Sequence, residues 1–202
     1  MPRVVLFWLI LSFGCGVVRA GEPEFTDVFV PKTDGFKSIR IPSVVVSKRG
    51  TVLAFAEGRA VNADQAQNKI LLKRSADGGR TWGPLAIIAN DGERSLNNPC
   101  AVVERETGVV VLVFQSYPAG LRERSNKIET GYEGEMVVRN YLIISADDGA
   151  SWSKPRDVTK ETKRREKVRT VASGPGIGIQ LRHGEHRVEI QWRRSDRKDD
   201  RP

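Results

Sequence analysis

An eight-residue pattern occurs twice in the 202-residue chain, 70 residues apart, and it constrains the fold more than any other feature of the sequence. SADGGRTW occupies residues 75–82, and SADDGASW occupies residues 145–152. Each copy follows a short apolar segment. An aspartate at a turn accepts hydrogen bonds from backbone N–H groups ahead of it, a glycine permits a positive φ, and the tryptophan packs at the hairpin base. The pattern therefore predicts two copies of one β-hairpin unit.

The rest of the chain has the same short-strand character, with almost no helical periodicity. Predicted strands lie at residues 39–46, 51–57, 70–73, 85–89, 101–104, 109–115 and 141–145. Between them stand Gly, Asn and Asp residues that are typical of turns. Strands of four to eight residues separated by such turns indicate an antiparallel, all-β protein.

Composition excludes several other classes of protein. After the N-terminus, no apolar run reaches the roughly 18 residues that a membrane-spanning helix needs. Two cysteines are too few for a disulfide scaffold. The net charge of +8 would by itself suggest a nucleic-acid binder, but the basic excess is concentrated in residues 160–170 and 182–202. The first of these clusters has no aromatic residue on which a base could stack. We therefore expect no nucleic-acid partner and no membrane span in the mature chain.

The first 20 residues have the pattern of an export signal. Arg3 supplies a positive start, residues 4–18 are almost wholly apolar, and Val18-Arg19-Ala20 places small residues at a cleavage site. We predict a cleaved signal peptide over residues 1–20 and a secreted or periplasmic protein. Two alternatives are an uncleaved anchor and a lipoprotein modified at Cys15, although the residues before Cys15 fit the lipidation pattern poorly.

The repeated pattern resembles the Asp box, or BNR repeat, of bacterial sialidases (neuraminidases). The resemblance covers about residues 37–186 and implies the N-terminal part of a six-bladed β-propeller, in which each blade is a four-stranded antiparallel sheet. In such propellers the Asp boxes lie on the outside, so the resemblance implies a structural role for them. Because a blade takes roughly 40–45 residues, we expect two to three blades within residues 21–187.

Residues 188–202 depart from the resemblance. They form a strongly charged tail where the family continues with an apolar strand. We interpret this tail as aberrant, as a frameshift or a truncation would produce it.

Three residues match positions that carry chemistry in sialidases. Arg40-Ile41-Pro42 is similar to a motif at the opening of the sialidase catalytic domain, which implies that Arg40 binds substrate. A guanidinium group can hold a carboxylate through two parallel hydrogen bonds, and sialic acid carries a carboxylate on its anomeric carbon. Glu57-Gly58-Arg59 implies a second substrate-binding arginine, Arg59. Asp64, in the polar loop that follows, would be the catalytic acid and base. Glu57 is the fallback acid.

Two further segments also resemble the family, at residues 97–108 and 173–181. We expect a turn, a strand and a hairpin in the first, and a glycine-rich entry into a strand in the second. The two histidines, His183 and His186, have no metal-ligand pattern around them, and we expect neither a metal nor a cofactor.

The resemblance implies an exo-alpha-sialidase, a glycoside hydrolase that releases terminal sialic acid from sialylated glycans. Sialidases use a tyrosine nucleophile, and no tyrosine here matches its context. The nucleophile, its glutamate partner and the remaining clamp arginines therefore have no counterpart, and we expect the chain to be inactive or impaired. The alternative is a non-catalytic secreted Asp-box β-propeller or glycan-binding module.

Overall fold

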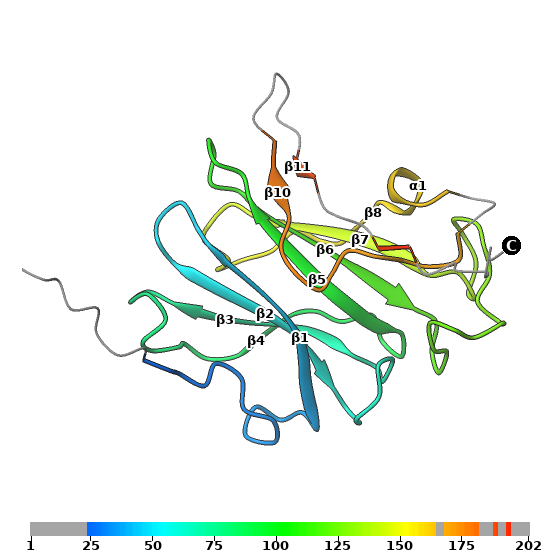
Figure 1. Ribbon diagram of the computed structural model, residues 1–202, viewed down its shortest axis with the longest axis horizontal. Coiled ribbons are helices and arrows are strands. Elements are labelled where there is room, and N and C mark those ends of the chain that lie inside the picture. The colour runs from blue at the N-terminus through cyan, green and yellow to red at the C-terminus, as the bar shows by residue number, and fades with distance from the viewer. Residues whose placement is uncertain (1–23, 165–167, 182–187, 190–192, 195–202) are drawn as a thin grey trace, which may run out of the picture.

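Two four-stranded antiparallel sheets make up most of the structure, a computed structural model that describes residues 24–164, 168–181, 188–189 and 193–194 (Figure 1). The first sheet has the order β1 (Ser38–Val46), β2 (Val52–Arg59), β3 (Lys69–Ser75) and β4 (Ala86–Ala89). The second has the order β5 (Ser95–Val103), β6 (Val110–Tyr117), β7 (Arg139–Ser145) and β8 (Arg156–Asp157). Strands adjacent in the sequence are thus adjacent in space, and the all-β prediction is confirmed.

The remaining elements are short. A single helical turn, α1 (Thr159–Thr162), follows β8. Two two-stranded pairs follow it: β9 (Val171–Ala172) pairs with β12 (Arg193–Arg194), and β10 (Ile179–Gln180) pairs with β11 (Val188–Glu189). Of the predicted charged tail, four residues therefore take part in strand pairing. The predicted signal peptide and both histidines lie outside the described residues. In the part of the chain that is described, no helix is long and apolar enough to span a membrane.

The hydrophobic core lies between the two sheets. Alternate residues of β2 and β6, among them Phe55 and Leu112, point toward it and are almost completely buried. Trp152, from the second copy of the repeated pattern, stands edge-on to Phe55, with ring centroids 5.7 Å apart. The repeat therefore contributes to the contact between the sheets as well as to its own hairpin.

The two copies of the repeat form the turns that lead from β3 toward β4 and from β7 toward β8. In the first copy Asp77 Oδ1 accepts hydrogen bonds from Thr81 N at 2.9 Å and Ser75 Oγ at 2.7 Å. Asp147 makes the matching contacts in the second copy, from Ser151 N at 2.9 Å and Ser145 Oγ at 2.8 Å. The predicted hairpin turns are present in both places.

The first strand of each sheet contains a β-bulge at the same place. The pairing register shifts between Arg40 and Ser43 in β1, and between Asn97 and Cys100 in β5. The residue before the proline has a positive φ in both cases, 56° at Ile41 and 54° at Asn98. A bulge leaves a residue unpaired, so it accommodates a proline within a strand and redirects neighbouring side chains.

This bulge corrects one expectation. Asn97-Asn98-Pro99 was predicted to be a turn ahead of a strand that begins at residue 101, but β5 already begins at Ser95. Asn and Pro are turn signals in sequence. Here they mark a bulge inside a longer strand, and six residues that were expected outside the sheet belong to it.

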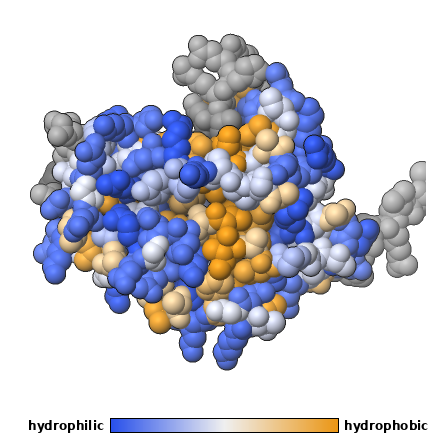
Figure 2. Space-filling view, turned by 180° about the vertical axis from the view of Figure 1, so that it is seen from behind, coloured by the Kyte–Doolittle hydropathy of each residue, from blue (hydrophilic) through white to orange (hydrophobic). Residues whose placement is uncertain are grey.

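Not all apolar surface is enclosed. Figure 2 shows hydrophobic residues gathered in a central band on one face, between hydrophilic regions. In β1, Val44 and Val46 are about half exposed (47% and 59%) because they alternate with the inward-facing Val45. The sheet face opposite the core is thus partly apolar.

Candidate active site

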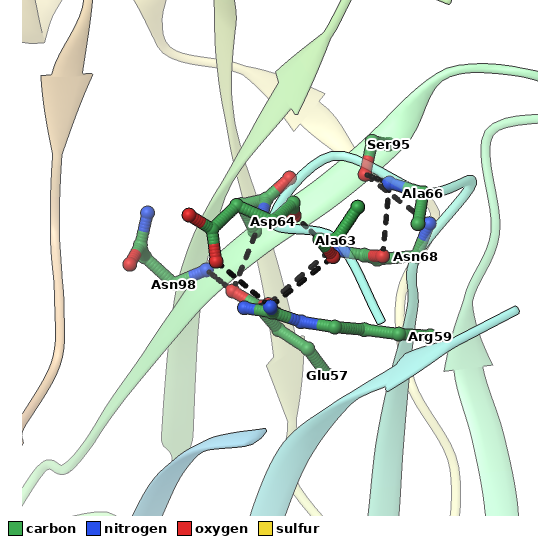
Figure 3. A network of polar contacts seen from close by, with 9 residues as sticks. Glu57, Arg59, Ala63, Asp64, Ala66, Asn68, Ser95 and Asn98 are labelled. Carbon is green, nitrogen blue, oxygen red and sulfur yellow. Dashed lines mark hydrogen bonds and ion pairs between the residues drawn. The ribbon is translucent and has the colours of Figure 1, made fainter. Parts of the chain in front are cut away.

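Polar side chains from both sheets meet where β2 ends and β5 begins. The loop of residues 60–68, which joins β2 to β3, closes over this place and carries Asp64 (Figure 3). Glu57 and Arg59 lie two residues apart on β2, so their side chains extend to the same face of the sheet. Both are charged residues with at most 1% of their surface exposed. Burial of this kind requires partners for every charged atom.

Glu57 and Arg59 are each other's main partners. Arg59 donates from Nε at 2.9 Å and from Nη2 at 2.6 Å to Glu57 Oε2. The other oxygen, Oε1, accepts from the backbone N–H of Asn98 at 2.6 Å. Burial raises the pKa of Glu57, while the hydrogen bond from Asn98 and the charge of Arg59 oppose that rise. Glu57 is therefore the counter-ion that fixes Arg59, and it is too enclosed to face a substrate as the fallback acid.

Arg59 presents its remaining nitrogen to the loop. Its Nη1 donates to Asp64 Oδ1 at 2.8 Å and to the carbonyl oxygen of Ala63 at 3.1 Å. The side chain of Asp64 is 73% exposed, whereas that of Arg59 is 2% exposed. A rigidly held cation thus orients a carboxylate that solvent and ligands can reach. The structure brings these two predicted site residues into direct contact.

Arg40 lies one strand away from this pair. Its Cα pairs with that of Glu57 across β1 and β2, which puts both side chains on one face of the sheet. The bulge follows immediately, and a β-branched residue at φ 56°, Ile41, is strained there. The side chain of Arg40 is exposed and has no hydrogen-bond or ion-pair partner among the described residues. The Arg40 guanidinium is exposed and forms no ion pair with Asp64 or Glu57, so it is accessible to an anion.

Two asparagines complete the site, and sequence reasoning assigned neither a role there. The side-chain amides of Asn68 and Asn97 both donate to the backbone carbonyl of Asp64, at 2.6 and 2.8 Å. The sequence around Asn97 predicts a turn. A run of polar residues, Ser95 to Asn98 with one leucine, within a strand that is otherwise apolar was the available signal.

The described residues give no support for a metal or a reactive thiol. Within the described ranges, no group of three or more His, Cys, Asp and Glu side chains is placed to hold a metal ion. Cys100 is buried in β5, and burial raises the pKa of its thiol to about 11. The charged side chains at this place are those of Arg40, Glu57, Arg59 and Asp64.

Comparison with known proteins gives a consistent result. The BNR repeat-like domain matches residues 50–188 of this chain. The chain is 32% identical over 180 residues to a sialidase from Micromonospora viridifaciens, covering 86% of this chain and 28% of that protein. It is 35% identical over 169 residues to an exo-alpha-sialidase from Aspergillus fumigatus, covering 75% of this chain and 40% of that protein. Human sialidase-3 is 34% identical over 165 residues, covering 78% and 37%.

Sialidases of known structure also match most of this chain. The Hadza microbial sialidase Hz136 superposes with a TM-score of 0.66 at 26% identity, over 74% of this chain and 31% of that one. The NanB sialidase of Streptococcus pneumoniae has a TM-score of 0.71 at 13% identity, over 88% and 45%, which is a likeness of fold. The chain spans about 28–40% of the length of the three curated relatives named above.

Proposed function

Since this chain belongs to the sialidase family that carries BNR repeat-like domains, we propose that it provides the carboxylate-binding and acid/base part of an exo-alpha-sialidase site. The substrate class is a glycan that ends in sialic acid. The reaction is hydrolysis of the bond between that sugar and the rest of the glycan. The observation that carries the proposal is the contact between buried Arg59 and exposed Asp64, with the unpaired Arg40 beside them.

Arg40 has the binding role in this proposal. Its guanidinium is exposed, and a planar fork matches the two oxygens of a carboxylate. Terminal sialic acid differs from neutral sugars by that carboxylate. An arginine without a protein partner at this place therefore gives selectivity for the acidic sugar.

Asp64 has the proton-transfer role. Its carboxyl would protonate the glycosidic oxygen as the bond breaks and would later take a proton from the attacking water. Arg59 orients the carboxyl from one side, and Glu57 holds Arg59. No tyrosine is assigned here as the nucleophile, so we expect slow turnover.

The two four-stranded sheets would be two adjacent blades of a sialidase-type propeller, with β9 and β10 at the start of a third. Their first strands, β1 and β5, lie side by side, and Ala101 N of β5 donates to Ser43 Oγ of β1 at 3.2 Å. These strands would line the propeller axis, which would put the site on that axis. Export by residues 1–20, to the periplasm or the exterior, is part of the same proposal.

Binding is the first test. Saturation-transfer NMR should show contact of the chain with the sialic acid ring of sialyllactose and no contact with lactose. Arg40→Ala should abolish the sialyllactose signal. Equal signals from both sugars, or none from either, would contradict the proposal.

Hydrolysis is the second test, with two leaving groups. Asp64→Asn should lower kcat on sialyllactose by about 10²–10⁴-fold, and by less on an aryl sialoside whose leaving group needs no proton. An equal loss on both substrates would show that Asp64 is not the acid. Binding of sialyllactose without hydrolysis of either substrate would show that this chain supplies only the binding part of the site, which is also what the alternative, a glycan-binding module, predicts.

A further inference from the structure

The loop that carries Asp64 is fixed through its backbone. Two side-chain amides donate to the carbonyl oxygen of Asp64, that of Asn68 at 2.6 Å and that of Asn97 at 2.8 Å. A carbonyl oxygen has two lone pairs, so both are used. The side chain of Asp64, by contrast, is 73% exposed and is oriented from one side by Arg59.

The two amides come from different sheets. Asn68 directly precedes β3 of the first sheet, and Asn97 lies on β5 of the second, in the strand that also contains the bulge. Both are buried, with 0% and 2% of their surface exposed. Ser95 of the same strand reinforces the link, because its Oγ accepts from the backbone N–H groups of Ala66 and Asn68 at 3.2 Å.

Glu57 determines which way both amides face. Asn68 Nδ2 lies 3.2 Å from Glu57 Oε2, and Asn97 Nδ2 lies 3.3 Å from Glu57 Oε1. A carboxylate accepts only, so each amide must present its NH₂ group. The same NH₂ group then reaches the carbonyl of Asp64. Oδ1 of Asn97 has no hydrogen-bond partner among the described atoms, so the NH₂ group makes all hydrogen bonds of the Asn97 side chain.

We propose that Asn97 is a positioning residue, which holds the Asp64 carboxyl in place by clamping the Asp64 carbonyl from the second sheet. The inference rests on the proposed function in one respect, that Asp64 transfers a proton. Proton transfer needs a heavy-atom distance near 3 Å, and a misplacement of about 1 Å costs roughly a hundredfold in rate. Without the amide of Asn97, the Asp64 carbonyl keeps only the hydrogen bond from Asn68, on its own sheet.

The chain offers a matched control. Asn140 is also a fully buried asparagine of the second sheet, and it donates from Nδ2 to Thr162 Oγ1 at 2.7 Å. Gln115 pairs with Asn97 on one side and with Asn140 on the other, so the three residues lie in one row across the sheet. Asn140→Ala therefore removes a similar buried hydrogen bond two strands away from Asn97.

The test compares the full chain with Asn97→Ala, Asn68→Ala and Asn140→Ala. Hydrogen exchange of the amides in residues 60–67 should accelerate at least roughly tenfold in Asn97→Ala and in Asn68→Ala, because each variant loses its hydrogen bond to the Asp64 carbonyl, and should not change in Asn140→Ala. On sialyllactose, kcat should fall about 10–100-fold in Asn97→Ala with KM within about threefold of the unaltered chain. Asn140→Ala should keep both constants. Where Asn97→Ala does not fold, Asn97→Ser provides the same comparison with a smaller change in volume.

Several outcomes would overturn the inference. Faster loop exchange with an unchanged kcat would make Asn97 a structural residue only. A raised KM with an unchanged kcat would make it a ligand contact, and an equal fall of kcat in Asn140→Ala would show a general loss of stability. If the unaltered chain neither binds nor hydrolyses sialyllactose, the proposed function itself fails and the inference falls with it. If the unaltered chain is active and Asn97→Ala is equally active, the inference alone fails.

Discussion

The backbone N–H of Asn98 donates to Oε1 of Glu57 at 2.6 Å, across the boundary between the two sheets. Asn98 has a positive φ of 54° at the bulge in β5, and this conformation aims its N–H at the end of β2. A backbone donor from the second sheet thus stabilises the buried carboxylate of the first. The ion pair of Glu57 with Arg59 therefore depends on how the sheets pack.

Removal of Glu57 should destabilise the protein strongly. Glu57→Ala leaves buried Arg59 with only the exposed Asp64 as a counter-ion, and we expect the free energy of unfolding to fall by about 3–5 kcal/mol. Glu57→Gln keeps the shape and one acceptor oxygen, so its cost should be smaller. Urea unfolding measures the free energy of unfolding of both variants. Glu133→Ala, at a residue whose side chain is 80% exposed, serves as the control and should stay within about 0.5 kcal/mol. Equal stability of Glu57→Ala and the unaltered chain would contradict the ion-pair account.

The Asp-box aspartates should support stability in a defined pH range. Hydrogen bonds from Thr81 hold the pKa of Asp77 below its ordinary value of 3.8, and those from Ser151 do the same for Asp147. A carboxyl whose pKa is lower in the folded state stabilises the fold above its unfolded pKa. That contribution is lost as the pH falls below about 3.8 toward the lower folded value.

Asp77→Ala should therefore lower the melting temperature at neutral pH and weaken its dependence on pH below about 4. Thermal unfolding followed by circular dichroism at several pH values measures this. Asp27→Ala is the control, since Asp27 is an exposed aspartate outside the repeats. If Asp77→Ala kept its stability but lost glycan binding, the structural role of the Asp box would be wrong.

Local features of the site could be predicted from the sequence, whereas contacts between the sheets could not. Arg59 and Asp64 are five residues apart, and the repeat contains its own hydrogen-bond partners, so both depend on local geometry. Asn97 contacts Asp64 only because β5 packs against the end of β2. The sequence around Asn97 predicted a turn because Asn and Pro are common in turns and rare in strand interiors. Glu57 was considered as an acid since nothing local shows that the second sheet buries it.

The two copies of the repeat should differ in their tolerance of a methyl group. Gly79 and Gly149 both have a positive φ, 95° and 77°, so alanine at either should cost about 1 kcal/mol for the backbone alone. A Cβ at position 149 would lie 3.1 Å from Leu53 Cδ2 in the core, whereas one at position 79 would meet nothing closer than Trp82 at 3.8 Å.

Gly149→Ala should therefore destabilise the fold by about 1 kcal/mol more than Gly79→Ala, and Leu53→Val should reduce that difference in the double variant. Urea unfolding of the two single variants and the double variant measures the coupling. An equal loss of free energy of unfolding in both glycine variants would show that the second repeat does not pack closely against Leu53 of the first sheet.

The binding role of Arg40 can be separated from any structural role by a change that keeps its charge. Arg40→Lys replaces a planar fork by a point charge, which can no longer form two parallel hydrogen bonds to a carboxylate. Loss of one charge-assisted hydrogen bond should weaken sialyllactose binding by roughly 10–100-fold. Because the Arg40 side chain is exposed and unpaired among the residues that the structure describes, the free energy of unfolding of Arg40→Lys should differ from that of the unaltered chain by less than about 0.5 kcal/mol.

Arg49→Lys, in the exposed turn at the other end of β1, is the matched control and should alter neither the affinity for sialyllactose nor the free energy of unfolding. Dissociation constants from NMR titration with sialyllactose give the comparison. Unchanged affinity in Arg40→Lys would place the carboxylate of the sugar elsewhere, and a large loss of stability would show that Arg40 supports the bulge rather than the ligand.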